Sequence, residues 1–404
     1  MKIKCRPEDF FVEELAELHP GPRGALGLYV LEKRGLSTLE AIAELARRLN
    51  RPPSAISAGG LKDKYALTRQ HVTIPGRPVP PMQMRGMKLE PLGRVEAPMT
   101  AAALRGNRFA IILRDLPDGT GRVLAERAEL AARQGLPNYF DEQRFGSLRG
   151  GKGFIARRLL EGDFEGALRM HLGAPSKLDS SRIREQRRRI EGSWGRWDEI
   201  FRFLPRGNER SVVDFLRGHP GRFAQAFELI ESRLAQLYLF AYQSYIWNEI
   251  LGRFLELLPA GGPVFRLPYA AGELRFLDRA APEQVAALRE MIIPLPCPKA
   301  RYEEGPLAES AAAVLSAEGL GLEQLRIRGT ERLQFRGGQR PALVFPGNLR
   351  AAGEQPDDLY HGRRKLRLDF TMPPGSYATI LIKFVARDLL PGSRASRNRL
   401  RRRR

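Results

Sequence analysis

One loop of this 404-residue chain places a carboxylate among cations. Asp63 lies between Lys62 and Lys64, just after the glycine pair Gly59-Gly60. Glycines let a backbone turn sharply or approach another molecule closely. Nearby cations favour the ionised form of a carboxylate and can also meet phosphate groups. Such an anion suits an enzyme that attacks a sugar or a base within a polyanion, although the loop taken alone fits a solvated hairpin turn better.

The charge of the chain points to a polyanionic partner. It contains 67 lysines and arginines against 46 acidic residues, a net charge of +21. Ser393–Arg404 holds seven arginines and no acid, but the rest of the chain is strongly basic without it. This balance indicates nucleic acid first and an anionic membrane surface second. The segment 391–404 cannot bury a core, so we predict that it is disordered in the absence of RNA.

The sequence lacks the signals of several other classes of protein. The longest apolar runs fall short of the roughly 18 residues of a membrane span, and the N-terminus has no signal-peptide core. Two cysteines and five scattered histidines do not form a metal-binding pattern. Gly146–Gly153 comes close to a phosphate-binding loop, but Gly153 stands where a hydroxyl should hold magnesium. We therefore expect a cytoplasmic protein that needs no metal.

The patterning of the chain predicts a mixed α/β fold. Ser37 and Glu40 form a capping box that starts a helix. Further helices are predicted at about 122–133, as short segments between 150 and 192, and as one long helix over Phe223–Leu257. Strands are predicted at Leu26–Leu31, His71–Ile74, Arg108–Arg114, Lys365–Phe370 and Tyr377–Val385.

Three further segments allow both a functional and a purely structural interpretation. Arg182–Arg189, followed by Trp194 and Trp197, suits either an RNA surface or a solvated helix face. The aromatic segment 138–146 is either a core turn or a platform for an extruded base, with Asn138 and Arg144 bonding to sugar or phosphate. Lys383 lies in an apolar run, and a buried lysine calls for an acid such as Asp63.

Six motifs that follow one another along the chain together resemble the TruD family of tRNA pseudouridine synthases. They are Lys4-x-x-Pro7-Glu8-Asp9-Phe10-x-Val12-x-Glu14, Gly60-x-Lys62-Asp63-Lys64-x-Ala66-x-Thr68-x-Gln70, Leu104-x-Gly106-Asn107-x-Phe109, Asn138-Tyr139-Phe140-x-x-Gln143-Arg144-Phe145-Gly146, Ser244-Tyr245-x-x-Asn248 and Pro374-Gly375-Ser376-Tyr377-Ala378-Thr379. The motifs span most of the chain, in the order of the family. This resemblance favours the enzymatic interpretation of the Asp63 loop.

The resemblance implies a particular architecture. A pseudouridine synthase catalytic domain, built around a bent and mainly antiparallel sheet, would comprise residues 1–160 and 345–390. A TruD-type insertion domain would occupy 161–344, and RNA would bind in the cleft between the two. The basic tail would follow at 391–404.

The resemblance also implies roles for individual residues. Asp63 takes the position of the catalytic aspartate and Lys4 that of an active-site lysine. The active-site aromatics and asparagine correspond to Phe140, Tyr377 and Asn138. Lys383 stands where the family usually has an arginine that pairs with the aspartate, so a point charge replaces a planar fork. The substrate-binding set that we predict is Lys4, Lys62, Lys64, Asn138, Phe140, Arg144, Tyr377 and Lys383.

The implied reaction is the isomerisation of a uridine in tRNA, most simply uridine 13, without a cofactor. A pseudouridine synthase that acts on another RNA or position stays open, and so does a non-catalytic RNA-binding protein with the same fold. A methyltransferase would show a glycine-rich cofactor loop and a deaminase a Cys/His zinc cluster, and neither is visible. The oligomeric state is open, with a monomer as the expectation.

Overall fold

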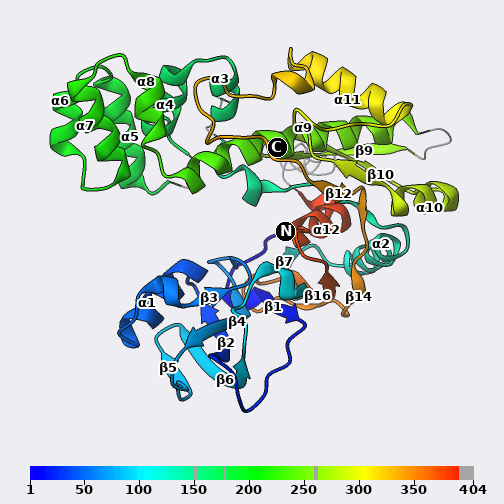
Figure 1. Ribbon diagram of the computed structural model, residues 1–404. Coiled ribbons are helices and arrows are strands. Elements are labelled where there is room, and N and C mark those ends of the chain that lie inside the picture. The colour runs from blue at the N-terminus through cyan, green and yellow to red at the C-terminus, as the bar shows by residue number, and fades with distance from the viewer. Residues whose placement is uncertain (149–152, 177–178, 259–262, 391–404) are drawn as a thin grey trace. The chain divides into compact units, whose positions relative to one another are not determined.

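The computed structural model describes residues 1–148, 153–176, 179–258 and 263–390 (Figure 1). The chain forms two compact units. Unit 1 comprises Met1–Leu136 and Val344–Arg404, and unit 2 comprises Pro137–Leu343. The chain thus leaves unit 1 at Leu136, before the boundary at 160 that the sequence suggested for the catalytic domain. The basic tail, 391–404, and residues 149–152 of the Gly146–Gly153 turn lie outside the described residues.

Unit 1 is built on one large sheet. Its strands are β1 (Phe10–Ala16), β2 (Leu26–Arg34), β3 (Ser57–Ala58), β4 (Leu67–Pro75), β5 (Met82–Met84), β6 (Met87–Val95), β7 (Leu104–Leu116), β14 (Gly347–Ala351), β15 (Gln355–Pro356) and β16 (Arg364–Met372). The main order is β14-β16-β7-β1-β4-β2-β6-β5. β1 and β4 run parallel, and the other strand pairings described in this sheet are antiparallel. The prediction of a mixed α/β fold around a mainly antiparallel sheet is therefore confirmed.

The centre of this sheet is held by aromatic contacts between strands. Phe109 on β7 lies opposite Val12 on β1 and Phe370 on β16. The rings of Phe109 and Phe370 stack with their centroids 5.1 Å apart, and Phe10 meets Phe109 edge to face at 6.3 Å. All three rings are buried. These contacts tie the C-terminal strand to the two N-terminal ones, so the sheet depends on both segments of unit 1.

Three α-helices accompany the sheet: α1 (Thr38–Arg48), α2 (Gly121–Gln134) and α12 (Ala378–Val385). Short 3-10 turns are η1 (Pro7–Asp9), η2 (Pro53–Ala55), η3 (Ala101–Ala103) and η6 (Arg387–Leu389). The predicted capping box of α1 is present: the Glu40 amide donates to Ser37 Oγ at 3.2 Å, and the Ser37 amide donates to Glu40 Oε2 at 2.8 Å.

The predicted strand Tyr377–Val385 is wrong, because this segment is helix α12. Six of its eight residues are buried, so the segment is a short apolar run interrupted only at Thr379 and Lys383. A short apolar run of this kind has the same pattern in a buried strand and in a buried helix. Lys383 therefore lies in the last turn of a helix rather than in a strand.

Unit 2 is mainly helical. Its helices are α3 (Ile155–Leu160), α4 (Phe164–Gly173), α5 (Ser181–Gly192), α6 (Trp197–Phe203), α7 (Asn208–Gly218), α8 (Phe223–Glu228), α9 (Ser232–Leu257), α10 (Pro282–Glu290), α11 (Pro306–Ala317), η4 (Glu142–Phe145) and η5 (Leu322–Gln324). Short strands are β9 (Val264–Tyr269), β10 (Gly272–Leu277), β11 (Ile292–Pro294) and β12 (Gln339–Pro341), while β8 (Leu136–Pro137) and β13 (Leu343–Val344) lie where the chain passes between the units. None of the helices in the described part of the chain is both long and apolar enough to cross a membrane.

The predicted long helix Phe223–Leu257 is interrupted, which leaves α8 and α9 as separate helices. Neither glycine nor proline marks the break. Instead, distant side chains take up the backbone carbonyls there: Arg332 Nη2 donates to Ile230 O at 2.6 Å, and Asn208 Nδ2 donates to Leu229 O at 2.6 Å. These tertiary contacts satisfy groups that a continuous helix would satisfy internally. The break is therefore set by residues far away in the sequence.

Candidate active site

The carboxylate of Asp63 is held by two different donors within unit 1. The Lys4 ammonium forms a salt bridge with Oδ2, and the Tyr65 amide donates to Oδ1 at 2.9 Å. Lys4 itself has a left-handed backbone with φ of 57° and places its ammonium 4.3 Å from the ring centroid of Phe10. The Lys4 and Asp63 side chains are 24% and 25% exposed. The carboxylate is thus fixed in orientation and still reachable from solvent.

The backbone of the same loop rests on a fully buried lysine. Lys33 on β2 has no exposed surface, and its ammonium donates to Leu36 O at 2.7 Å and to Asp63 O at 2.9 Å. Burial lowers the pKa of Lys33 to about 8, against the opposing effect of the Asp63 negative charge. A buried charge is tolerated only where polar groups surround it. Lys33 therefore anchors the peptide unit of Asp63, for which the sequence predicts a catalytic role.

Lys62 and Gln70, two further residues of the motifs, connect this loop to α1 and β4. The Lys62 amide donates to Thr38 Oγ1 at 2.9 Å, and Thr38 Oγ1 donates to Gln70 Oε1 at 2.8 Å. Gln70 Nε2 in turn donates to Gly60 O at 3.4 Å. Thr38 and Gln70 are both buried. This chain of hydrogen bonds explains why a buried glutamine follows the loop at residue 70, where a strand core would otherwise be apolar.

The two lysines that flank Asp63 form ion pairs with other acids. Lys62 Nζ lies 2.7 Å from Glu14 Oε1, and Lys64 Nζ lies 2.6 Å from Glu40 Oε1. The Lys62–Glu14 pair is nearly buried, whereas the Lys64–Glu40 pair is about half exposed. Lys62 thus braces the loop from within unit 1, while Lys64 keeps an exposed ammonium at the surface.

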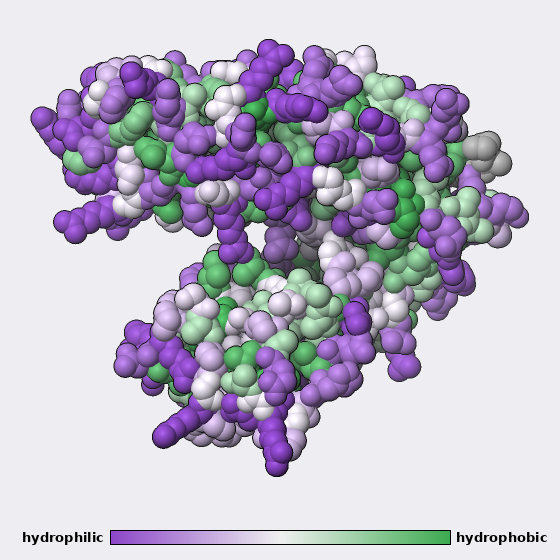
Figure 2. Space-filling view, viewed as in Figure 1, coloured by the Kyte–Doolittle hydropathy of each residue, from purple (hydrophilic) through white to green (hydrophobic). Residues whose placement is uncertain are grey.

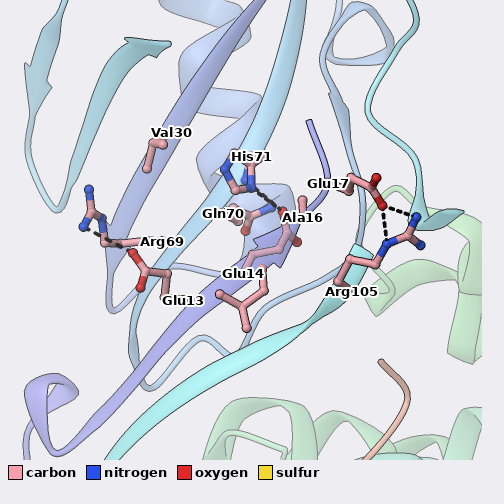
Figure 3. Close-up of a pocket in the computed structure, with 10 residues that line it drawn as sticks. Glu13, Glu14, Ala16, Glu17, Val30, Arg69, Gln70, His71 and Arg105 are labelled. Carbon is pink, nitrogen blue, oxygen red and sulfur yellow. Dashed lines mark hydrogen bonds and ion pairs between the residues drawn. The ribbon is translucent and has the colours of Figure 1, made fainter. Parts of the chain in front are cut away.

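Glu14 links this brace to a cavity of about 680 Å³ that the ends of β1 and β4 line. Figure 3 shows Glu14 and His71 pointing toward each other there: Glu14 Oε2 accepts from the His71 amide at 2.9 Å and lies 3.3 Å from His71 Nδ1. Burial alone would raise the pKa of Glu14. The hydrogen bonds from His71 and the charge of Lys62 outweigh it and hold the pKa below the usual value.

Replacement of Glu14 by glutamine is expected to destabilise the fold by about 3 kcal/mol at neutral pH, because it leaves Lys62 without its buried partner. The lowered pKa of Glu14 means that its contribution is present above pH 4.5 and is lost as the pH falls. Urea unfolding of both proteins at several pH values would measure this. A difference in stability that grows below pH 4.5 would contradict the assignment.

Tyr377 and Lys383 both belong to α12 in unit 1. Tyr377 is the N-cap residue of the helix, and Lys383 lies in its last turn with a half-buried side chain. In the described part of the chain, the structure shows an ion pair between Asp63 and Lys4. The pairing of Asp63 with Lys383 that the sequence suggested therefore stays a proposal.

The predicted aromatic platform lies in unit 2 and is anchored by α9. Asn248 Oδ1 accepts from the Phe140 amide at 2.9 Å, and Asn248 Nδ2 donates to Phe140 O at 2.8 Å. The Phe140 ring meets Trp247 edge to face at 5.6 Å and is only 6% exposed. Arg144 lies with its guanidinium carbon 5.4 Å from the ring centroid. The fourth and fifth motifs thus meet in one buried cluster.

Arg340 completes this cluster. Its guanidinium donates to Asn138 O at 2.6 Å and to Asn138 Oδ1 at 2.7 Å, and its central carbon lies 4.0 Å from the Phe140 centroid. Asn138 Nδ2 also donates to Pro341 O at 3.2 Å. One cation therefore orients both Asn138 and Phe140.

Lys33 and Arg340 are the two residues that the sequence analysis missed. Lys33 had a signal: it continues the alternation of Tyr29 and Leu31, both buried on β2, so a lysine stands at a core position. Arg340 had none, because it lies on a short strand about 200 residues from its contacts and matches none of the six motifs.

Comparison with known proteins identifies the family of the chain. The family model of tRNA pseudouridine synthase D (TruD) matches residues 1–385. A protein of Methanococcus maripaludis named "Probable tRNA pseudouridine synthase D 1" is 32% identical over 95% of this chain and 99% of its own length. The Aquifex aeolicus tRNA pseudouridine synthase D is 29% identical over 95% of this chain and 97% of its own.

Solved structures agree as well. The crystal structure of the protein assigned as TruD from Methanosarcina mazei superposes with a TM-score of 0.72 and 26% identity, over 95% of this chain and 93% of that one. The match extends through the sheet of unit 1 and the helices of unit 2 alike. The family that the six motifs indicated is confirmed: the chain belongs to the tRNA pseudouridine synthase D family and is an isomerase of that family.

Proposed function

We propose that this protein converts uridine 13 of tRNA to pseudouridine, with Asp63 as the catalytic carboxylate. The observation that carries the proposal is the way Asp63 is held. Its two oxygens have separate donors, Lys4 and the Tyr65 amide, and its peptide carbonyl is bound by the buried Lys33. A catalytic group has to be held in a productive orientation by its surroundings. An ordinary hairpin turn needs no buried lysine beneath it.

The reaction balances without any external electron. The bond between C1′ and N1 of the uridine breaks, the uracil rotates, and a bond forms between C1′ and C5. The C5 proton leaves, and N1 gains a proton. Asp63 acts as a nucleophile at C1′ or C6, or as the base that removes the C2′ proton. In each case the carboxylate has to act as an anion, and the adjacent Lys4 ammonium is its ion-pair partner.

The target base must leave the RNA stack before Asp63 can reach it, which costs a few kcal/mol. We assign Phe140 and Tyr377 to contacts with the flipped base, and Asn138 and Arg144 to contacts with its sugar and phosphate. Arg340 acts through these groups, because it binds the Asn138 side chain and covers the Phe140 ring. It is therefore a positioning residue.

Lys62 and Lys64 are assigned by their present contacts, and Lys383 by the position that it takes in the resemblance to the family. Lys383 serves as the second cation for Asp63 when the substrate is bound. Lys62 supports the loop through Glu14, and Lys64 meets the RNA backbone from its exposed pair with Glu40. A point charge at Lys383 can neutralise the aspartate but cannot orient it as a bidentate arginine would. The Tyr65 amide supplies that orientation instead.

The direct test is to map pseudouridine on an unmodified tRNA transcript treated with the purified protein. Carbodiimide adducts stop primer extension one nucleotide before each pseudouridine, and we expect one new stop, at position 13. A transcript with cytidine at position 13 is the matched control and should show none. A stop elsewhere in both transcripts would reject position 13. Binding without any stop would make the chain an RNA-binding protein that does not catalyse the reaction.

A further inference from the structure

Helix α5 of unit 2 carries more positive charge than its surroundings neutralise. Ser181–Gly192 holds five arginines and two glutamates. Three of these arginines, Arg182, Arg184 and Arg188, are exposed, and among the described residues none of them has an ion-pair partner. Some other exposed arginines of unit 2, such as Arg196 and Arg217, do pair with acids. Others have no ion-pair partner among the described residues either, but α5 carries three such arginines within seven residues.

The placement of these arginines weakens the helix that carries them. Arg182 is the second residue of α5, in a first turn that contains no acid, so its charge opposes the helix dipole. Arg184 and Arg188 are four residues apart, which makes them neighbours of like charge on one face. Each effect costs a few tenths of a kcal/mol. Glu185 is the one acid on this exposed side, and it offsets only part of the charge.

The other two arginines of α5 fix it to the neighbouring helices. Arg187 is buried, pairs with Asp179 at 3.1 Å and lies 3.7 Å from Glu209 at the start of α7. Arg189 lies 4.0 Å from the ring centroid of Phe203 at the end of α6. The loop between α6 and α7, which contains the exposed Arg206, is therefore next to α5. Hydrophilic side chains predominate over these helices in Figure 2.

The aromatic part of this segment does not belong to the surface. Trp197 is 7% exposed and meets Trp194 edge to face at 4.9 Å, while Trp194 Nε1 donates to Glu165 at 2.9 Å. The tryptophans thus pack against the core of unit 2, and stacking on RNA bases is not what this face offers. It offers mainly guanidinium groups, which suit phosphate oxygens.

We propose that Arg182, Arg184 and Arg188, together with Arg206, form a docking surface for the RNA backbone. The inference rests on the proposed function for the identity of that RNA as tRNA. The unneutralised charge costs helix stability and has no structural use among the described residues, so a bound polyanion is what offsets it. The surface binds phosphates, gives affinity without sequence preference, and leaves the choice of uridine to other parts of the protein.

The test compares two triple variants of the full chain that change the net charge equally. The first, R182Q/R184Q/R188Q, removes the unpaired arginines. The second, R169Q/R196Q/R217Q, removes three exposed arginines of unit 2 that already pair with acids. Filter binding of a tRNA transcript over a salt series gives the slope of log K against log salt for each. Thermal unfolding is followed in parallel.

We expect the first variant to flatten the salt slope by about three, one for each lost phosphate contact, with a melting temperature that stays the same or rises. The second variant should keep most of the slope and lose stability. Equal slopes in the two variants would overturn the inference. So would a first variant that still binds tRNA normally but no longer binds vesicles containing phosphatidylserine.

These binding measurements do not depend on turnover. If the wild-type protein makes no pseudouridine but the first variant has a flatter salt slope, the proposed function is rejected and the docking surface is supported. Conversely, the wild-type protein could form pseudouridine at position 13 while the first variant keeps the wild-type salt slope. That result would support the proposed function and reject the docking surface.

Discussion

Asp63→Asn is expected to abolish pseudouridine formation, a loss on the order of 10²–10⁴-fold or more. The amide has almost the same shape, so it can still accept from the Tyr65 amide. It carries no negative charge and can act neither as a nucleophile nor as a base. The tRNA affinity should stay within a few-fold, because the basic surface and the aromatic cluster are unchanged.

Single-turnover assays with saturating protein, paired with filter binding, separate these two effects. Asp118→Asn is the matched control, since Asp118 is also an ion-paired carboxylate of unit 1, bound to Arg364 at 2.6 Å. The control should retain full activity. If Asp63→Asn turned over tRNA at the wild-type rate, Asp63 would have no place in the mechanism.

Lys33→Met is expected to lower activity by about 10²-fold even though Lys33 cannot touch the substrate. Methionine fills a similar volume, but it leaves the carbonyls of Leu36 and Asp63 without their donor. Each unsatisfied buried carbonyl costs about 1–3 kcal/mol, and the loop would shift to reach water. A displacement of about 1 Å at a reacting group can cost 10²-fold in rate. The effect should fall on kcat rather than on tRNA affinity.

The pH dependence of stability gives Lys33→Met a second measurement. The pKa of Lys33 is about 8 in the folded protein and 10.5 as its ordinary value. Between these values the unfolded chain binds more protons, so the contribution of Lys33 to the free energy of unfolding rises with pH. The full change is about 3 kcal/mol. Urea unfolding at pH 7.5, 9 and 10 should show wild type gaining stability relative to the variant.

Lys88→Met serves as the control for both measurements. Lys88 lies on the neighbouring strand β6, half exposed and paired with Glu90 at 2.5 Å. Its replacement should change neither activity nor the pH dependence by a measurable amount. An equal loss of activity in both variants would show that Lys33 has no special position beneath Asp63.

Local signals in the sequence were reliable where neighbours along the chain determine the structure. The capping box of Ser37 and Glu40 started a helix as predicted, and the alternating Lys365–Phe370 segment became part of β16. The predictions failed where distant residues decide. Arg332 and Asn208 bind backbone carbonyls where the long helix is interrupted, and the apolar run of α12 is too short to distinguish a buried helix from a buried strand.

Some residues of the candidate site could likewise be predicted from local sequence patterns, and others could not. The six motifs predicted active-site roles for Asp63, Lys4 and Phe140 through their resemblance to the TruD family, and these roles stay predictions. The residues that hold these side chains in place were harder to find. Lys33 could have been predicted only by extending the alternation of buried residues on β2 two residues beyond Leu31. Arg340 could be found only from its contacts, since no local pattern distinguishes it from the many other arginines of the chain.

The position of β16 in the sheet has a consequence for how the protein is made. β16 pairs with β7 over most of its length, yet the ribosome completes β7 at Leu116 and reaches β16 only at Arg364. At roughly 5–20 residues per second, β7 waits about 10–50 s for its partner while all of unit 2 is synthesised. During that time its apolar edge is open to pairing with another chain. The order of synthesis therefore exposes newly made protein to aggregation through the edge of β7 until residue 372 has emerged.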